Sequence, residues 1–353
     1  MNHGLQILGD GPPDPVDRML VDQLTGLPSL PGSVVVLDDA TGDLAPAVAK
    51  AVRGQVRVHC DDLAAEEVLA GAGFTPSALS ADLFDGAGLV LMRLPRALAA
   101  LREYAELTAA HAAPSVRLIG AARIKHMSRS MNEVLGESFE HVWAGLGRQK
   151  CRALHASGPR PVDPQWPRAG MVEVPGGPLE LRSHGAAFAA GRLDDGTRLL
   201  LQALADAHPG SSLTGRQALD LGCGTGILAT WLARAGADVQ AVDSSAAAQR
   251  SAIATAAANE VDVEVRRSTD LSFLDDASLD LVVCNPPFHK GAAKDSTAAF
   301  EMIHGAARIL RPGGELWLVY NSHLPYLRAL RRHVGETRIV QRNRHYTVTR
   351  TTR

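Results

Sequence analysis

Asp220-Leu-Gly-Cys-Gly-Thr-Gly226 follows a short apolar run and precedes a helix-like stretch at residues 227–235. Three glycines in five positions predict a tight turn through which the backbone can pass close to a ligand, because glycine tolerates backbone angles that other residues avoid. A strand, a glycine-rich turn and a helix in this order are typical of an open α/β sheet, which binds ligands at the carboxyl ends of its strands.

Short apolar segments alternate with alanine-rich stretches through the remainder of the chain. This alternation predicts an α/β fold with a doubly wound, Rossmann-like parallel sheet. A β-hairpin around Pro175-Gly-Gly-Pro178 and a helix at residues 194–208 are predicted before the sheet begins. The strands predicted for the sheet are residues 218–221, 239–242, 263–266, 279–284 and 315–320.

The first half of the chain repeats this pattern in a weaker form. We interpret residues 1–155 as a degenerate domain of the same fold that lost its cofactor and serves RNA or substrate recognition, or acts as a scaffold. The alternative is that any two α/β domains align this well by chance. The matched positions are Asp38 with Asp220, Asp61 with Asp243, and Arg93 with Asn285.

A proline-rich stretch separates the two halves. Residues 156–170 contain Pro159, Pro161, Pro164 and Pro167, a composition that resists both helix formation and strand pairing. We therefore predict a linker at residues 156–170 and a second, catalytic domain at residues 171–353.

Composition narrows the class of protein. The chain has 353 residues, 46% of them hydrophobic and 21% charged, which is long enough for two globular domains. It contains no run of 18 apolar residues and does not begin like a signal peptide, so we expect a cytoplasmic protein with no membrane contact. Its four cysteines are far apart and form no CxxC pair, so we expect neither a disulfide nor a metal site.

The spacing of the glycine turn favours one cofactor over another. A dinucleotide-binding turn requires its third glycine one position later, where this chain has Ile227. The tighter spacing suits S-adenosylmethionine, whose amino-acid end needs backbone contacts and carries no pyrophosphate. The turn residues expected to bind this cofactor are Asp220, Gly222, Gly224 and Gly226.

Two further aspartates follow predicted strands. Asp243 ends the second strand of the sheet, where a carboxylate can accept both ribose hydroxyl protons; alternatively it caps the helix that starts near Ala246. Asp270 follows the third strand and is a candidate for the adenine amino group; the alternative is an ordinary turn aspartate.

Asn285-Pro286-Pro287-Phe288 follows the fourth predicted strand and so faces the same edge as the glycine turn. An exocyclic amine on a purine is a poor nucleophile because its lone pair is delocalised into the ring. An amide oxygen, together with a neighbouring carbonyl held rigid by prolines, can accept both amine hydrogens and aim the lone pair at a sulfonium methyl. Phe288 can stack on the base, which must leave its helix to reach the site. A proline-rich turn without function is the alternative.

These two motifs resemble those of class I methyltransferases that modify amino nitrogens. Within that class the chain resembles the ribosomal RNA guanine-N2 methyltransferases, which pair an inactive amino-terminal domain with an active carboxyl-terminal one, and it leans towards the large-subunit type. Further matching segments are Leu89-Val-Leu-Met-Arg-Leu-Pro95, Gly120-Ala-Ala-Arg-Ile-Lys125, Phe188 with Gly191-Arg-Leu-Asp194, and Asn321-Ser-His-Leu-Pro-Tyr326.

The resemblance implies an S-adenosylmethionine-dependent enzyme that methylates the N2 amine of a guanine in ribosomal RNA, with RNA or the ribosomal subunit as partner. It assigns the target guanine to Asn285 and Phe288 with the two intervening prolines, and the cofactor to the turn glycines, Asp220, Asp243 and Asp270, with Asn285 next to it.

RNA binding must come from basic surface, since the net charge is only −2 and aromatic residues make up 4% of the chain. Other classes remain open: an N-methyltransferase of a protein glutamine or a small-molecule amine, or a non-catalytic RNA-binding or assembly factor. The candidate RNA-binding side chains are Arg123, Lys125, Arg129, Arg328, Arg331, Arg332, Arg342 and Arg344.

Overall fold

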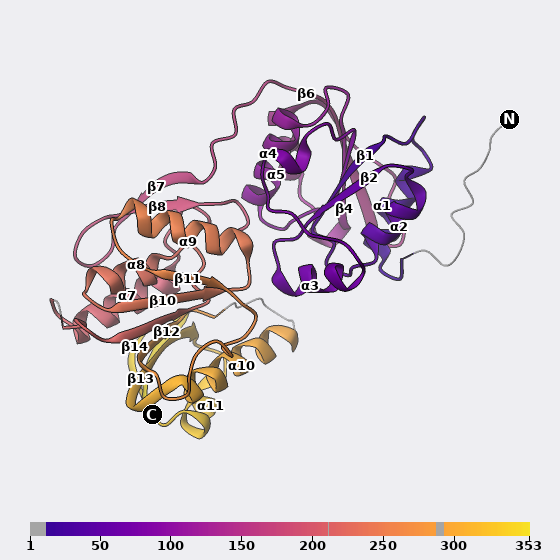
Figure 1. Cartoon of the computed structure of the whole chain (residues 1–353). Coiled ribbons are helices and arrows are strands. Elements are labelled where there is room, and N and C mark those ends of the chain that lie inside the picture. Colours follow the sequence, from indigo (N-terminus) through magenta and orange to yellow (C-terminus); the bar gives the residue numbers. More distant parts are fainter. Residues whose placement is uncertain (1–11, 211, 287–292) are drawn as a thin grey trace. The chain divides into compact units, whose positions relative to one another are not determined.

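The computed structural model describes residues 12–210, 212–286 and 293–353, and the chain forms two compact units, residues 1–166 and residues 167–353 (Figure 1). Both units are α/β, as the alternation of apolar segments predicted. Each unit has its own sheet, with helices packed against it.

The second unit contains a seven-stranded sheet in the order β11-β10-β9-β12-β13-β15-β14. Strands β9 to β13 pair in parallel, whereas β15 runs antiparallel to both β13 and β14. The strands are β9 (Gln217–Leu221), β10 (Asp238–Asp243), β11 (Glu264–Arg267), β12 (Leu279–Cys284), β13 (Leu310–Asn321), β14 (Glu336–Arg342) and β15 (Tyr346–Thr352).

Helices cover both faces of this sheet because successive strand residues point to opposite sides. Alternate residues such as Leu281 and Val283 pack towards α7, α8 and α9, whereas Val282 and Cys284 pack towards α10 and α11. The predicted hairpin is present as β7 (Arg168–Val172) and β8 (Leu179–Ser183). The helices are α7 (Asp195–Ala207), α8 (Ile227–Arg234), α9 (Ala246–Ala258), α10 (Ala293–Ile309) and α11 (Tyr326–His333).

The first unit repeats this architecture with one strand fewer. Its sheet has the order β2-β1-β3-β4-β6-β5, which corresponds to β10-β9-β12-β13-β15-β14 and lacks a counterpart of β11 among the described residues. Its strands are β1 (Ser33–Leu37), β2 (Gln55–His59), β3 (Leu89–Arg93), β4 (Arg117–Arg123), β5 (Phe139–Ala144) and β6 (Cys151–Pro159). Its helices are α1 (Pro15–Leu24), α2 (Leu44–Ala51), α3 (Leu63–Gly71), α4 (Ala81–Phe84), α5 (Leu98–His111), the short 3₁₀ turn η1 (Ile124–His126) and α6 (Arg129–Ser138).

The segment between the units is shorter than the predicted linker of residues 156–170. Strand β6 continues to Pro159, which pairs with Phe139 at the end of the ladder, a position that tolerates a proline. At the other end, Arg168 already pairs with Ser183. Residues 160–167 therefore join the last strand of one unit to the first strand of the next.

Candidate active site

Three elements of the second unit end at the same level of its sheet. Leu221 of β9 pairs with Val242 of β10 on one side and with Cys284 of β12 on the other. The next residues along these strands are Gly222, Asp243 and Asn285. The sheet therefore brings the glycine turn, the ribose candidate and the asparagine motif to one edge, as the sequence predicted.

The glycine turn is held by its own backbone. The N–H groups of Gly222 and Cys223 both donate to the carbonyl of Val242, at 2.9 and 3.0 Å. Gly222 and Gly224 have φ angles of 77° and 53°, in the left-handed region that favours glycine. A Cβ on Gly224 would meet only the Cβ of Phe188, at 3.8 Å, so space beside this part of the turn is left for a ligand.

Gly226 serves a different purpose from the other two glycines. It precedes α8 with a φ of 78°, and a Cβ there would lie 2.8 Å from the Cα of Ala252 in α9. The absence of a side chain at Gly226 thus allows α8 and α9 to pack closely, and the contact of Gly226 with the cofactor stays a prediction.

Asp220 is fully buried at the end of β9. Its Oδ2 accepts a hydrogen bond of 2.9 Å from the N–H of Ala229, in the first turn of α8. Its Oδ1 is buried without a hydrogen-bond partner among the described residues. Burial raises the pKa of Asp220 to about 7. An unpartnered buried carboxylate oxygen beside a glycine turn fits a ligand that brings a cation or an N–H donor, such as the ammonium of an amino acid.

Asp243 links the glycine turn to the following helix. Its Oδ2 accepts from the N–H of Gly224 at 2.9 Å, and its Oδ1 accepts from the N–H of Ser245 at 3.0 Å. The cap of α9 is Ser245, whose hydroxyl accepts from the N–H of Ala248, so the alternative that Asp243 caps this helix is wrong. A carboxylate oxygen can accept more than one hydrogen bond, so both oxygens of Asp243 can still receive hydroxyl protons.

Asp270 is exposed and organises its own turn. Its Oδ1 accepts from the backbone N–H of Ser272 at 2.9 Å and from the Ser272 hydroxyl at 2.7 Å. The hydrogen bond from this backbone N–H lowers the pKa of Asp270 below its usual range. The alternative role in a turn is therefore present, and the contact of Asp270 with adenine stays a prediction.

Asn285 is half-buried and anchored through its amide nitrogen. Nδ2 donates to the hydroxyl of Thr197 at 2.9 Å and lies 3.2 and 3.4 Å from the two carboxylate oxygens of Asp194. The adjacent Pro286 is buried, and Pro287 and Phe288 lie outside the described residues. The stacking role predicted for Phe288 therefore stays a prediction.

Asp194 and Thr197 are functional candidates that sequence reasoning missed. Asp194 lies in a segment that carries the resemblance and starts the helix predicted at residues 194–208, but neither pattern assigned it a role in the site. It caps α7 by accepting from the N–H groups of Gly196 and Thr197, at 3.0 and 3.1 Å. The contact with Asn285 joins residues 91 positions apart, which no local pattern reveals.

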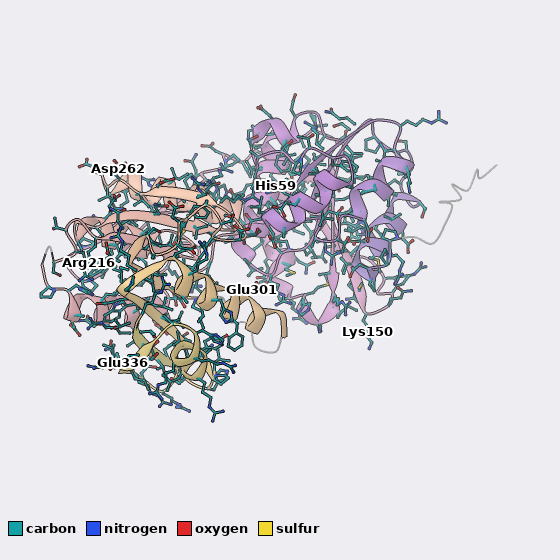
Figure 2. The ribbon with its side chains drawn as sticks, turned by 60° about the horizontal axis from the view of Figure 1, so that its bottom comes forward. His59, Lys150, Arg216, Asp262, Glu301 and Glu336 are labelled. Carbon is teal, nitrogen blue, oxygen red and sulfur yellow. The ribbon has the colours of Figure 1, made fainter. Side chains whose placement is uncertain are left out.

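The pairing of strands shows which residues of the first unit correspond to the candidate site of the second unit. Leu37 pairs with His59 (labelled in Figure 2) and with Met92, as Leu221 pairs with Val242 and Cys284. Arg93 therefore does stand in the position of Asn285, as the sequence pattern predicted. The aspartates were misaligned: by sheet register Asp38 corresponds to Gly222, and Asp61 lies one position beyond the counterpart of Asp243.

Backbone geometry supports this corrected alignment. The N–H of Asp38 donates to the carbonyl of His59, as that of Gly222 donates to Val242, and Asp38 also has a positive φ, of 56°. The Asp38 side chain accepts from the N–H of Asp61 and from the hydroxyl of Tyr104. The turn of the first unit thus carries a carboxylate with its own protein partners where the second unit has a glycine.

Comparison with known proteins finds a matching family model for each half of the chain. Residues 178–350 match the family model "Methyltransferase small domain", and residues 14–160 match "RLMG N-terminal domain". The "Ribosomal RNA large subunit methyltransferase G" of Streptomyces coelicolor is 33% identical, over 98% of this chain and 97% of that protein. The protein of the same name from Pseudomonas syringae pv. syringae is 35% identical, over 89% of this chain and 86% of that protein.

The chain belongs to the ribosomal RNA large subunit methyltransferase G family. A solved structure has the same two-unit fold: the T. thermophilus 16S rRNA N2 methyltransferase, in complex with AdoMet and guanosine, matches with a TM-score of 0.81 and 26% identity, over 97% of this chain and 92% of that chain. The predicted resemblance, the tandem class I methyltransferase fold and S-adenosylmethionine as the methyl donor of this family are thereby confirmed.

Membrane-spanning helices and metal clusters are both absent from the described part of this family member. No helix there is long and apolar enough to cross a membrane. The same residues contain no group of three or more histidine, cysteine, aspartate or glutamate side chains that could hold a metal ion.

Proposed function

We propose that this chain transfers a methyl group from S-adenosylmethionine to the exocyclic N2 amine of a guanine in large-subunit ribosomal RNA. The observation that supports it most is the anchoring of Asn285 through Nδ2 by Thr197 and Asp194. With its nitrogen turned towards α7, the amide has its oxygen left to accept a hydrogen from a target amine. The names of the relatives support ribosomal RNA as the substrate class.

In the proposed mechanism, this chain's residues bind and orient rather than supply a strong base. Asp220, Gly222 and Gly224 hold the amino-acid end of the cofactor, Asp243 its ribose and Asp270 its adenine, while Gly226 shapes the turn. When bound, the cofactor supplies a methyl group already activated by the positive sulfur. Positioning and electrostatics therefore provide the main acceleration.

The target amine is held by acceptors. The Oδ1 of Asn285 and the backbone carbonyl beside it, kept rigid by Pro286 and Pro287, accept the two amine hydrogens and direct the nitrogen lone pair at the methyl. Phe288 stacks on the flipped guanine, a contact worth about 1–3 kcal/mol. After transfer, the amine nitrogen carries an acidic ammonium, which loses its proton to solvent water, so no dedicated general base is required.

We assign the first unit to RNA recognition or to a scaffold without a cofactor. Arg93 stands where the second unit has its asparagine, and the carboxylate of Asp38 stands where the second unit has Gly222. Both replacements remove features that the proposed mechanism requires.

The test is transfer of labelled methyl from S-adenosylmethionine to purified large subunits, small subunits and their protein-free RNAs, followed by nucleoside analysis. We expect label in N2-methylguanosine of large-subunit RNA from the wild-type chain. An Asn285→Ala variant should lose this label while it still binds the cofactor. Label in another nucleoside, or in protein only, would overturn the proposal.

A further inference from the structure

The two units share a pair of polar side chains at the start of one helix, a likeness that the similar strand order of their sheets does not require. In each unit, the helix that precedes the first strand of the large sheet (β1 or β9) begins after an aspartate cap, which is Asp14 for α1 and Asp194 for α7. Three residues after each cap stands a buried polar side chain, Asp17 in the first unit and Thr197 in the second. Asp14 and Asp17 face Arg93, whereas Asp194 and Thr197 face Asn285. Arg93 and Asn285 occupy corresponding positions in the two sheets.

The contacts of the two pairs correspond one to one. Arg93 Nη1 donates to Asp14 at 3.2 Å and also to Asp17, while Asn285 Nδ2 donates to Asp194 at 3.2 Å and to Thr197 at 2.9 Å. The same two backbone positions thus hold a nitrogen donor in both units.

The chemistry of the partners differs in a consistent way. A guanidinium in the first unit faces two carboxylates, and a neutral amide in the second faces one carboxylate and one hydroxyl. The pocket at the start of the helix is therefore matched to the charge of the donor it receives in each unit.

An ionised carboxylate accepts hydrogen bonds and cannot donate them. Of the two ends of the Asn285 amide, only the NH₂ group can face Asp194 favourably. Thr197 accepts the second hydrogen of this group, which uses both donors on the α7 side. The orientation of the amide is then fixed by its partners, and its oxygen is directed away from α7.

We propose that Asp194 and Thr197 are positioning residues that fix the Asn285 amide with its oxygen towards the substrate, and so make the site selective for a target that donates N–H groups. This inference rests on the proposed function of Asn285 as the acceptor of a target amine. It extends that function to two residues on a different element, which touch neither substrate nor cofactor in the proposed mechanism.

Asp194→Asn is the most informative variant. Asparagine caps helices as well as aspartate does, because its amide oxygen can still accept from Gly196 and Thr197, so α7 is retained. The capping oxygen, Oδ1, also lies 3.2 Å from Nδ2 of Asn285 and is retained, whereas the new NH₂ group replaces Oδ2, which lies 3.4 Å from Nδ2 and then faces it as a second donor. We expect kcat to fall by about 100-fold, as for other misplaced reacting groups. The melting temperature, KM and the dissociation constant of S-adenosylhomocysteine should stay near the wild-type values.

Thr197 supplies an independent pair of variants. Thr197→Val keeps the shape of the side chain and removes the acceptor, so kcat should fall by about 10-fold or more. Thr197→Ser keeps the hydroxyl and should restore most of kcat. A purely structural role would not separate valine from serine in this order, because serine leaves the larger packing defect.

The control is the corresponding cap of the first unit. Asp14→Asn changes the same kind of cap while Arg93 retains Asp17, and it should leave kcat unchanged. All variants are assayed as full chains on large subunits or on whichever substrate the wild type methylates. If the wild type labels no RNA amine, the proposed function fails; if the wild type is active and Asp194→Asn and Thr197→Val keep its kcat, the positioning inference fails.

Discussion

For Asp220, the sequence motif predicted a role in the site but not the burial, hydrogen bonding or pKa of the side chain. Its place at the end of a strand and before three glycines predicted a contact with the cofactor. The structure adds that the side chain is fully buried, is tied to α8 through one oxygen and has a pKa raised to about 7. These properties come from packing against distant elements, which the motif does not encode.

The raised pKa gives a prediction for the ligand-free protein. An ordinary aspartate titrates near 3.8, so the folded chain retains a proton on Asp220 between pH 3.8 and about 7 that the unfolded chain has lost. The free energy of unfolding therefore falls as the pH rises through this window and levels off above it. At about 1.4 kcal/mol for each pH unit, the burial of the charge costs on the order of a few kcal/mol at pH 8.

Asp220→Asn removes this cost because it cannot ionise. We expect the melting temperature of the variant, minus that of the wild type, to increase from pH 5 to pH 8 when both are measured without cofactor by calorimetry. Asp270→Asn is the control, since that exposed carboxylate has a lowered pKa and its loss should give no such increase. A difference for Asp220→Asn that is constant over this range would contradict the buried, protonated state.

At the scale of elements, two glycines with positive φ in one turn have different purposes. A Cβ on Gly226 would lie 2.8 Å from the backbone of Ala252, so alanine there must push α8 away from α9. A Cβ on Gly224 would meet only the Cβ of Phe188, at 3.8 Å. Alanine costs about 1–2 kcal/mol at either position through backbone strain, and overpacking adds about 1–3 kcal/mol at Gly226 alone.

We therefore expect Gly226→Ala to lower the free energy of unfolding by roughly 2–5 kcal/mol, and Gly224→Ala by about 1–2 kcal/mol. Gly224→Ala should instead weaken S-adenosylhomocysteine binding by about ten-fold or more, because its methyl group enters the space next to the turn. Urea unfolding and titration calorimetry on both variants measure the two effects. Equal loss of stability in the two variants would show that the helix contact is not what requires Gly226.

Much of the element order was readable from hydrophobic alternation, because parallel strands buried on both faces are continuous apolar runs. The antiparallel edge formed by β14 and β15 was not predicted, since arginine and threonine side chains interrupt its apolar pattern. In β15, Thr347, Thr349 and Thr351 are buried beside Val348 and supply the inner surface that an apolar run would otherwise mark. The end of strand β6, residues 156–159, was assigned to the linker because of the prolines in that stretch.

At the scale of the whole molecule, sheet register decided which residues of the two units correspond. The sequence pattern matched Arg93 with Asn285 correctly and misplaced both aspartate pairs, because equal spacing along the chain does not determine where a turn leaves its sheet. Because register aligns Arg93 with Asn285, it also relates their partners, the aspartate caps of α1 and α7. The sequences of these two helices give no sign of a shared contact. The contacts of Asn285 are visible in the second unit alone, whereas their counterpart at Arg93 is recognised only when the two units are compared position by position.

Two of the arginines predicted to bind RNA lie next to each other on helix α11. Arg331 and Arg332 are exposed on α11, and no ion pair is found for either among the described residues. If they neutralise phosphates of the RNA, replacing both with alanine should weaken RNA binding. It should also reduce the steepness of log K against log salt by roughly 1.4–1.8, because fewer counterions are released from the RNA when two phosphate contacts are missing. Filter binding of protein-free large-subunit RNA over a series of salt concentrations measures both quantities.

The matched control for these arginines is the double replacement of Arg338 and Arg266, which are exposed but already pair with Glu336 and Glu264. They should contribute little to the slope, because a neighbouring carboxylate already balances their charge. An unchanged slope in the Arg331 and Arg332 variant, or an equal fall in the control, would exclude α11 as part of the RNA-binding surface.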